Sequence, residues 1–390
     1  MAKVWVTHLT KYVLLTFPFT PKSRPDKLNA IHQALRVTRA DVMKALVEAV
    51  SRCPNVTFKC GHRTTSIDES STGVTLTFNS GETVHGDLLL GCDGIHSATR
   101  TLHVEPSRLE HYSGIANAFG FAPLSAPSLA SVKASGLHFR STAINFARRG
   151  MLLTSYYESS KSSVYVGGLL QIPEVSDRNG WKVRGADQAA TKADMKDRFA
   201  TADVVHNDIE PLIDAAADWF MWPVYTLSAG GKWATKRTML LGDAAHAMPP
   251  QGEATGIVLE DTVLFARCLF EYPNPASSGD KDKNTETMLA SAFARYEALR
   301  RPRIEAAFKE SAAVVKTVQD AGAVGHRIKC VVVPWFLWFT RAKREKHFIE
   351  DVTTCSLEPE VPKAGVEKVA VPVAAVGVIV AVAAWSWGYI

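Results

Sequence analysis

The sequence contains no closely spaced pair of cysteines. Its six cysteines lie far apart, and they form neither a Cys-x-x-Cys pair nor a pattern with histidine that would bind a metal. A zinc module and a Cys-x-x-Cys redox motif are therefore excluded, no metal site is expected, and a reducing compartment fits this cysteine usage best.

A concentrated block of one charge is also missing. The chain has 44 Lys and Arg residues against 39 Asp and Glu residues, which leaves a formal net charge of +5. The basic residues are scattered over all 390 positions, as expected for a modestly basic, solvated surface. We therefore expect no nucleic-acid partner.

Two N-terminal signals are absent. Lys11 and the Pro- and Lys-containing residues 18–27 interrupt the apolar beginning, so no cleavable secretory signal is recognisable. The early residues also lack a Gly-x-Gly-x-x-Gly turn following a strand, which is the usual phosphate-binding turn of a dinucleotide-binding βαβ unit.

The composition is that of a globular protein. Apolar residues make up 46% of the chain and charged residues 21%. A chain of 390 residues can bury a large core, and its length predicts two interleaved domains rather than one.

The most informative stretch is residues 238–269. Residues 238–241 form a short apolar run that Gly242 ends, which predicts a buried strand. Turn residues through Gly252 then lead into a run with helical apolar spacing. The pattern predicts a strand that is followed, after a turn, by a helix.

This junction carries groups that can bind a ligand. Asp243 can accept hydrogen bonds from ligand hydroxyls, and the N–H groups near Thr255 and Gly256 carry partial positive charge at the start of the helix. The expected ligand offers hydroxyls at one end and an anion at the other.

A second helix is predicted from Thr38, which is a good N-cap with Asp41 in the first turn. Its apolar residues share one face, and Arg39 lies on or beside the polar side. Taken alone, Arg39 is expected to be a solvated surface charge, although a guanidinium can also bind a phosphate.

A third stretch is residues 88–100. Before this stretch, a strand is expected near residues 56–60. The alternation at residues 74–78, followed by a turn at 79–81, predicts a hairpin. The apolar run that ends at Asp93 and Gly94 is typical of a parallel strand, whose carboxyl end is where open α/β sheets bind ligands.

These stretches, residues 37–46, 88–100 and 238–269, resemble in the same order the motifs of FAD-dependent monooxygenases of the aromatic-hydroxylase type. That family contains para-hydroxybenzoate and salicylate hydroxylases. The resemblance extends over most of residues 31–310. It implies an α/β, three-layer FAD/NAD(P)-binding fold that is N-terminally incomplete, with an interleaved, mainly β substrate domain and a C-terminal helical tail.

The resemblance also implies a cofactor site. Arg39 is expected at the phosphate or ribityl side of FAD, Asp243 at the ribityl chain, and the helix start at the pyrimidine edge of the flavin. The Asp-Gly pair resembles a motif that contacts both FAD and NAD(P)H. The expected cofactor-binding residues are Arg39, Asp93, Gly94, Asp243, Gly252, Thr255 and Gly256.

The function implied is hydroxylation or epoxidation of an aromatic or other apolar small molecule with FAD, NAD(P)H and dioxygen. Two alternatives remain open: a truncated, noncatalytic member that acts as a membrane-attached binding protein, and a flavin-dependent reductase on the same fold. Two features depart from the family pattern, namely the missing glycine-rich turn and acidic Glu253 in the loop after Gly252.

No catalytic residue is assigned. His246 lies inside the motif, where fixing the loop by hydrogen bonding is the favoured role. Glu260 and Asp261 are adjacent and point in different directions from a helix, so they form no paired-carboxylate site. Aromatic residues between positions 146 and 222 could line a substrate pocket, but core packing is the more common role of such residues.

The expected domain organisation follows from these motifs. The boundaries are residues 1–104 for the first part of the FAD-binding domain, 105–235 for the substrate domain, 236–330 for the second part of the FAD-binding domain, 331–368 for a basic and aromatic connecting segment and 369–390 for a transmembrane helix.

The last of these segments has no charged residue. At about 1.5 Å per residue a helix of this length spans a hydrocarbon core of ~30 Å. We therefore expect a C-terminal membrane anchor with the folded domain on the cytosolic side. The competing hypothesis is a cytoplasmic protein in which this segment is a buried last helix.

Overall fold

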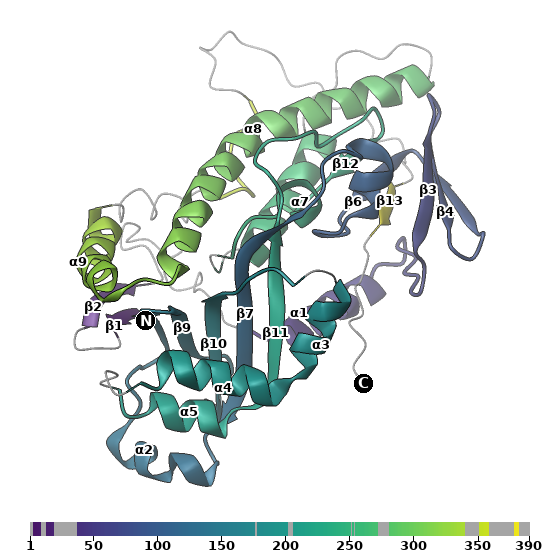
Figure 1. Cartoon of the computed structure of the whole chain (residues 1–390). Coiled ribbons are helices and arrows are strands. Elements are labelled where there is room, and N and C mark those ends of the chain that lie inside the picture. The colour runs from purple at the N-terminus through teal and green to yellow at the C-terminus, as the bar shows by residue number, and fades with distance from the viewer. Residues whose placement is uncertain are drawn as a thin grey trace. The chain divides into compact units, whose positions relative to one another are not determined.

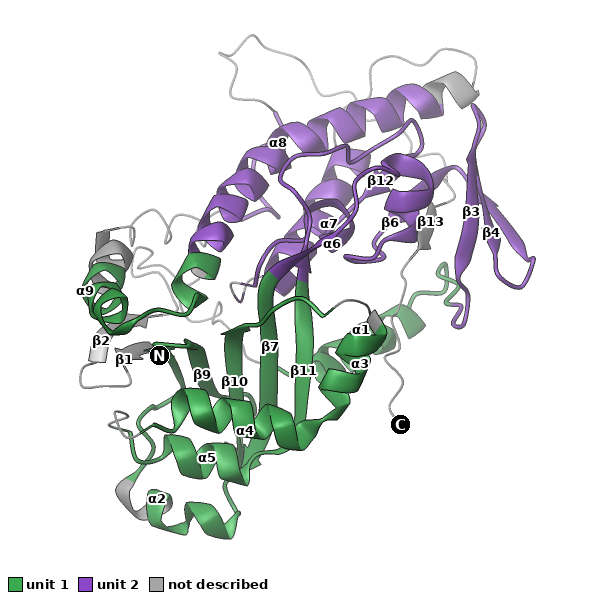
Figure 2. Cartoon of the chain, in the orientation of Figure 1, with its two compact units in different colours: residues 1–58, 114–224, 315–350 green, residues 59–113, 225–314, 351–390 purple. Residues whose placement is uncertain are grey.

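The structure is a computed structural model of the chain (Figure 1). It describes residues 3–8, 13–18, 37–175, 178–201, 206–250, 252, 254–271, 281–339, 351–358 and 378–381. The chain divides into two compact units (Figure 2). Unit 1 contains residues 1–58, 114–224 and 315–350, and unit 2 contains residues 59–113, 225–314 and 351–390.

A seven-stranded sheet is the centre of unit 1. The strands in spatial order are β11 (Ala217–Thr226), β7 (His111–Pro123), β10 (Ser163–Gln171), β9 (Gly150–Tyr156), β8 (Thr142–Ala147), β1 (Lys3–His8) and β2 (Val13–Pro18). Strand β10 is antiparallel to both β7 and β9, and β1 is parallel to β8. This largely antiparallel sheet agrees with the mainly β character that the resemblance implies for this region.

Helices cover one face of this sheet. They are the short α2 (Ala130–Ser135), which follows a 3-10 turn (Pro127–Leu129), and α3 (Arg178–Ala186), α4 (Gln188–Phe199) and α5 (Ile209–Ala215). The side chains of Met195 and Phe199 from α4 lie against Gly168 and Gly150 of the strands. These glycines leave room for the helix to approach, which closes the core on this side.

Helix α1 (Arg39–Ser51) begins where the sequence predicts. The side chain of Thr38 accepts a hydrogen bond from the backbone N–H of Asp41, so the N-cap prediction is confirmed. No residue of α1 is buried, however, and Leu46 remains 49% exposed. The apolar face of α1 is therefore largely uncovered. Unit 1 also contains α9 (Ala323–Phe339).

Unit 2 contains a parallel sheet of β12 (Thr238–Leu240), β6 (Leu88–Gly91) and β13 (Val378–Ala381), with β6 in the centre. An antiparallel sheet of β3 (Thr64–Glu69), β4 (Val74–Phe78) and β5 (Thr83–Gly86) accompanies it. The predicted hairpin and both predicted parallel strands are confirmed. Residues 56–60, where we expected a strand, are irregular and pair with none of the described strands.

The helices of unit 2 pack on the parallel sheet. They are α6 (Asp243–His246), α7 (Ala254–Phe270) and most of α8 (Lys281–Val318), together with a π-helical turn (Arg100–Val104). Leu240, Leu264, Phe293 and other apolar residues from these elements form one core. Helix α8 continues through Pro302, which lacks the N–H for an intrahelical hydrogen bond.

The expected membrane anchor at residues 369–390 is wrong. Val378–Ala381 is extended and pairs in parallel with β6, from Val378 beside Leu88 to Ala381 beside Gly91. Within the ranges that the structure describes, no helix is long and apolar enough to cross a bilayer. An uncharged run offers its apolar side chains equally well to a sheet and to lipid, so composition alone cannot separate the two. The other residues of this segment lie outside the described ranges.

Glu69, the last residue of β3, connects the two sheets of unit 2. It accepts hydrogen bonds from Thr235 Oγ1, Thr238 Oγ1 at 2.9 Å and the backbone N–H of Lys236 at 3.1 Å, and His103 Nε2 lies 3.1 Å away. Burial would raise the pKa of Glu69, but the hydrogen bonds from His103 and the threonines outweigh it and lower the pKa to about 2.

We expect the substitution Glu69→Gln to reduce the free energy of unfolding at pH 7 by about 3 kcal/mol, because each unit of pKa shift corresponds to about 1.4 kcal/mol. A lowered folded-state pKa stabilises fully above the unfolded value of 4.5, and this contribution is lost as the pH falls toward about 2. Urea unfolding of both proteins at pH 7 and pH 3 measures it. The difference in unfolding free energy between the wild type and Glu69→Gln should shrink in acid. The control Glu48→Gln, at an exposed position, should not change the unfolding free energy at either pH. A difference for Glu69→Gln that does not change with pH would contradict the assignment.

Candidate functional site

Two loops leave the same edge of the parallel sheet in unit 2. Strands β6 and β12 are parallel neighbours, and Gly91 at the end of β6 pairs with Leu240 at the end of β12. Asp93 and Gly94 follow the first strand, and Asp243 follows the second. The structure thus brings these predicted residues to one edge, because the carboxyl ends of adjacent parallel strands coincide.

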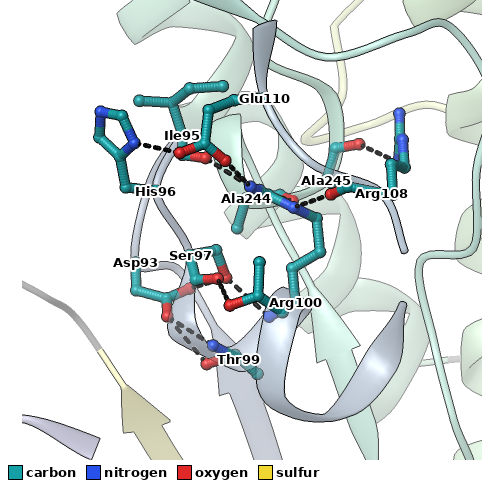
Figure 3. Close-up of polar contacts among 11 residues, drawn as sticks. Asp93, Ile95, His96, Ser97, Thr99, Arg100, Arg108, Glu110, Ala244 and Ala245 are labelled. Carbon is teal, nitrogen blue, oxygen red and sulfur yellow. Dashed lines mark hydrogen bonds and ion pairs between the residues drawn. The ribbon is translucent and has the colours of Figure 1, made fainter. Parts of the chain in front are cut away.

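Asp93 is occupied by its own loop. Its carboxylate accepts hydrogen bonds from Ser97 Oγ at 2.5 Å and from both the backbone N–H and the hydroxyl of Thr99, at 2.9 and 3.0 Å (Figure 3). The carboxylate therefore shapes the turn. The next residue, Gly94, has φ +77°, and a Cβ built there would meet no atom within 4 Å. The unfilled space beside this turn therefore lies at Gly94.

Arg100 joins the two loops. Its guanidinium is fully buried and donates to the carbonyl oxygens of Ala244 at 3.0 Å and Ile95 at 2.6 Å, and to Glu110 Oε2 at 3.1 Å (Figure 3). Burial lowers the pKa of Arg100, against the opposing effect of Glu110. Because Ala244 directly follows Asp243, this arginine holds the second loop against the first.

Arg108 extends the same arrangement. It donates to the carbonyl oxygen of Ala245 at 3.0 Å (Figure 3). It also donates to the carbonyl oxygen of Ser228 at 2.6 Å. Two buried arginines thus hold consecutive carbonyl groups of α6. The spacing of Arg100 after the Asp-Gly pair belongs to the resemblance, but no signal in the sequence singles out Arg108.

The loop that Arg100 and Arg108 hold presents Asp243. This residue is exposed, whereas the three residues that follow it in α6 are buried. Gly242 before it has φ +61°, and a Cβ there would lie 2.9 Å from Val258 Cγ2 of α7. Only glycine suits this close approach of α7 with this backbone conformation.

A buried ionic network fixes the other side of the loop. Asp261 Oδ2 accepts a hydrogen bond from the backbone N–H of Gly242 at 3.0 Å and lies 2.8 Å from His246 Nε2. Asp261 Oδ1 accepts from Arg300 Nε at 2.5 Å. Burial would raise the pKa of Asp261, but His246 and Arg300 outweigh it and lower the pKa. The loop-fixing role predicted for His246 is confirmed.

Arg300 and Asp261 were not assigned from the sequence. The run of arginines in residues 295–303 indicates pairing with carboxylates, but sequence spacing does not identify which carboxylate. Arg300 is buried and also donates to Glu260 and to the carbonyl oxygen of Ile257 in the first turns of α7. It therefore holds the start of α7 in place.

The amino-terminal end of α7 is open. Gly252, with φ +89°, precedes the helix, and Thr255 and Gly256 are exposed in its first turn. No atom lies within 4 Å of a Cβ built at either glycine. The first N–H groups of a helix have no partner within the helix, and Thr255 and Gly256 are exposed, so this helix start favours a negative group. Glu253 lies outside the described residues.

Arg39 belongs to unit 1, whereas the other expected cofactor residues belong to unit 2. Arg39 is exposed at the start of α1, and its guanidinium carbon lies 5.8 Å from the centre of the Trp222 ring. Such a distance is typical of a cation–π contact. Within unit 1 the structure therefore associates Arg39 with an aromatic side chain of the large sheet.

The residues of unit 2 fit a flavin nucleotide. Asp243 can accept hydrogen bonds from a chain of hydroxyls, the start of α7 can face an anionic ring edge, and Gly94 and Gly252 leave space for close approach. This is the combination of hydroxyls and negative charge that the sequence pattern predicts.

Comparison with known proteins agrees with a flavin-binding role for these residues. The family model described as "FAD binding domain" matches residues 21–259. Hispidin-3-hydroxylase of Neonothopanus nambi is 28% identical over 70% of this chain and 62% of its own length. Salicylate hydroxylase of Pseudomonas putida is 29% identical over 68% and 59%, respectively. The chain thus spans less than two thirds of these relatives.

Solved structures share the fold. A variant of Klebsiella pneumoniae HpxO complexed with FAD has a TM-score of 0.64 and 18% identity, covering 89% of this chain and 80% of its own. A salicylate hydroxylase substrate complex has a TM-score of 0.62 and 22% identity, covering 80% and 73%. The expected α/β fold is confirmed. Because the family model covers more than half of the chain, the protein belongs to the FAD-binding-domain family of aromatic-hydroxylase-like flavoproteins.

Proposed function

We propose that the protein is an FAD-dependent monooxygenase that uses dioxygen and NAD(P)H to hydroxylate or epoxidise an aromatic or other apolar small molecule. The observation that carries the proposal is the exposed carboxylate of Asp243 beside the open start of α7, within a matched FAD-binding domain. The names of the relatives support the reaction class, since they include hydroxylases and monooxygenases of aromatic compounds.

FAD supplies the redox and oxygen-transfer chemistry when bound, because no side chain can activate dioxygen for hydroxylation. The residues of the chain position and polarise it. Asp243 accepts hydrogen bonds from the ribityl hydroxyls, and the N–H groups around Thr255 and Gly256 stabilise negative charge at the pyrimidine edge. Arg39 pairs with the phosphate or ribityl side, and Gly94 and Gly252 allow the backbone to approach.

The observed contacts revise one of these roles. Asp93 already accepts three hydrogen bonds from Ser97 and Thr99. We therefore propose that Asp93 contributes to cofactor binding through the shape of its turn, which presents Gly94. NAD(P)H as the co-substrate and the domain boundaries at residues 104, 235 and 330 remain predictions.

We expect Asp243→Ala to weaken FAD binding by roughly 10- to 150-fold, because a charge-assisted hydrogen bond contributes about 1.5–3 kcal/mol. Equilibrium dialysis of FAD with the full chain measures the dissociation constant. Asp68→Ala removes an exposed carboxylate from β3 of the same unit and should leave the dissociation constant unchanged. Equal affinities of the Asp243→Ala variant and the wild type would refute the assignment of Asp243.

Activity is tested with the FAD-loaded full chain. Substrate-dependent NAD(P)H oxidation, with incorporation of one atom of labelled dioxygen into an aromatic product, is the expected result. Oxidation of NAD(P)H without incorporation of oxygen would instead identify a flavin-dependent reductase, and FAD binding without any turnover would identify a noncatalytic member.

A further inference from the structure

One face of the unit 1 sheet is apolar, aromatic and only half covered. On β7 the residues Asn117, Phe119 and Phe121 are half-buried, whereas the residues between and beside them are buried on the opposite face. The same alternation continues on β10, where Tyr165 pairs with Phe121 in the ladder and is also half-buried. Among the described residues, α4 lies on the other face, where Met195 and Phe199 contact Gly168 and Gly150.

The aromatic rings of this face form a continuous row across three strands. Phe119 of β7 stacks with Tyr165 of β10 and with Phe220 of β11, at ring-centre distances of 5.7 and 5.2 Å and interplanar angles of 25° and 28°. Trp222 meets Phe119 edge-on at 5.0 Å. Packed rings of this kind hold one another in place and form a preorganised surface for another planar ring.

The central part of this face that β7, β10 and β11 form carries no charged side chain. Side chains that share the face through the ladder register include Leu153 of β9 and Ile144 of β8, which pair with each other and are half-buried. Between Asn117 and Phe121 of β7, Tyr165 and Leu169 of β10, and Phe220 and Val224 of β11, the face carries no ionisable group other than the tyrosine hydroxyl. The amide of Asn117 is its main polar group.

Arg39 is the cation that reaches the edge of this row, through its contact with Trp222. It comes from the exposed start of α1, not from the sheet. A carboxylate placed over the middle of the row would lose its hydration without gaining a charged partner, which is unfavourable. An uncharged ring loses little on leaving water and gains stacking contacts.

We propose that this face binds an uncharged, planar aromatic substrate, stacked beside Phe119, Phe220 and Trp222, with a hydroxyl or carbonyl group hydrogen-bonded to Asn117. The proposal names the substrate class of the monooxygenase and so rests on the proposed function. It separates this chain from relatives such as salicylate hydroxylase, which is named for a carboxylate substrate.

The test compares ligands that differ by one carboxylate. The FAD-loaded full chain is titrated with 2-naphthol and with 3-hydroxy-2-naphthoate, and binding is followed by perturbation of flavin absorbance and by equilibrium dialysis. We expect at least about tenfold tighter binding of 2-naphthol. Equal or tighter binding of the naphthoate would overturn the proposal.

Variants of the face make the test specific. Asn117→Arg places a cation within the row and should narrow or reverse the preference for 2-naphthol. Phe119→Leu and Trp222→Leu should each weaken 2-naphthol binding about tenfold, whereas Phe58→Leu, which changes an aromatic side chain that is 57% exposed in the same unit, should not. Unchanged 2-naphthol binding in both leucine variants would also overturn the proposal.

Binding and turnover separate the two hypotheses. If 2-naphthol binds with the expected preference but is neither hydroxylated nor stimulates NAD(P)H oxidation, the proposed reaction fails while the substrate-binding face stands. If only the carboxylated ligand is hydroxylated, the reaction stands and the inference about the face is wrong. Thermal unfolding of each variant identifies any variant that has lost its fold. The variants that remain folded then test whether this face binds the uncharged ligand.

Discussion

Replacing Arg100 with methionine is expected to lower the free energy of unfolding of the protein by about 3–5 kcal/mol, the usual cost of removing one member of a buried ion pair. The guanidinium is fully buried, and methionine fills a similar volume without its donors. The substitution leaves the carbonyl oxygens of Ala244 and Ile95 without these hydrogen bonds and removes the guanidinium that lies beside Glu110.

The same change is expected to lower FAD affinity at least tenfold, because the hydrogen bond from Arg100 to the carbonyl oxygen of Ala244 holds the loop that carries Asp243. Urea unfolding gives the stability, and dialysis at 10 °C, where the folded variant remains populated, gives the FAD dissociation constant. Arg63→Met changes an exposed arginine of the same unit and is the matched control. Wild-type stability of the Arg100→Met variant would show that the buried contacts contribute little.

Asp261→Asn is the second change with a large expected effect. The amide keeps the shape of the carboxylate but not its charge, so Arg300 remains buried without the partner that lies 2.5 Å away. We expect a loss of about 3–5 kcal/mol in the free energy of unfolding at pH 7. The amide of Gly242 and the ring of His246 lose a charged acceptor together, so FAD binding should weaken as well.

The pH dependence of stability provides a second test of the role of Asp261. The pKa of Asp261 is lowered in the folded protein, so its stabilisation is complete above the ordinary value of 3.8 and disappears as the pH falls through the lower folded pKa. Wild-type stability should therefore fall more steeply in acid than that of Asp261→Asn, as measured by unfolding at a series of pH values. Glu271→Gln, at the exposed end of the same helix, should leave the pH profile unchanged; parallel profiles of the Asp261→Asn variant and the wild type would refute the role of Asp261.

Much of the fold is predictable from local patterns. Alternation at Val74–Phe78 and the apolar run of Leu88–Gly91 become β4 and β6 because the period of a strand and its burial are properties of a few consecutive residues. Thr38 starts α1 for a similarly local reason, since its side chain caps an amide three residues away.

The tail shows where local patterns fail. A run without charge is suited both to a bilayer and to a buried sheet position, and the length of this run favours the bilayer. In the structure Val378–Ala381 pairs with β6, a strand that is distant in sequence. The free energy of such a pairing depends on an available neighbouring edge, which no property of the segment itself reveals.

By itself the sequence determined the two junctions after β6 and β12, the open glycines and the family, because each depends on residues that are close together in the chain. Only the tertiary structure decided the roles of the buried charges. Arg100 and Arg300 reach Ala244 and Asp261 across long sequence separations, and burial makes those contacts strong. Sequence spacing carries no record of such partners, because the fold brings them together.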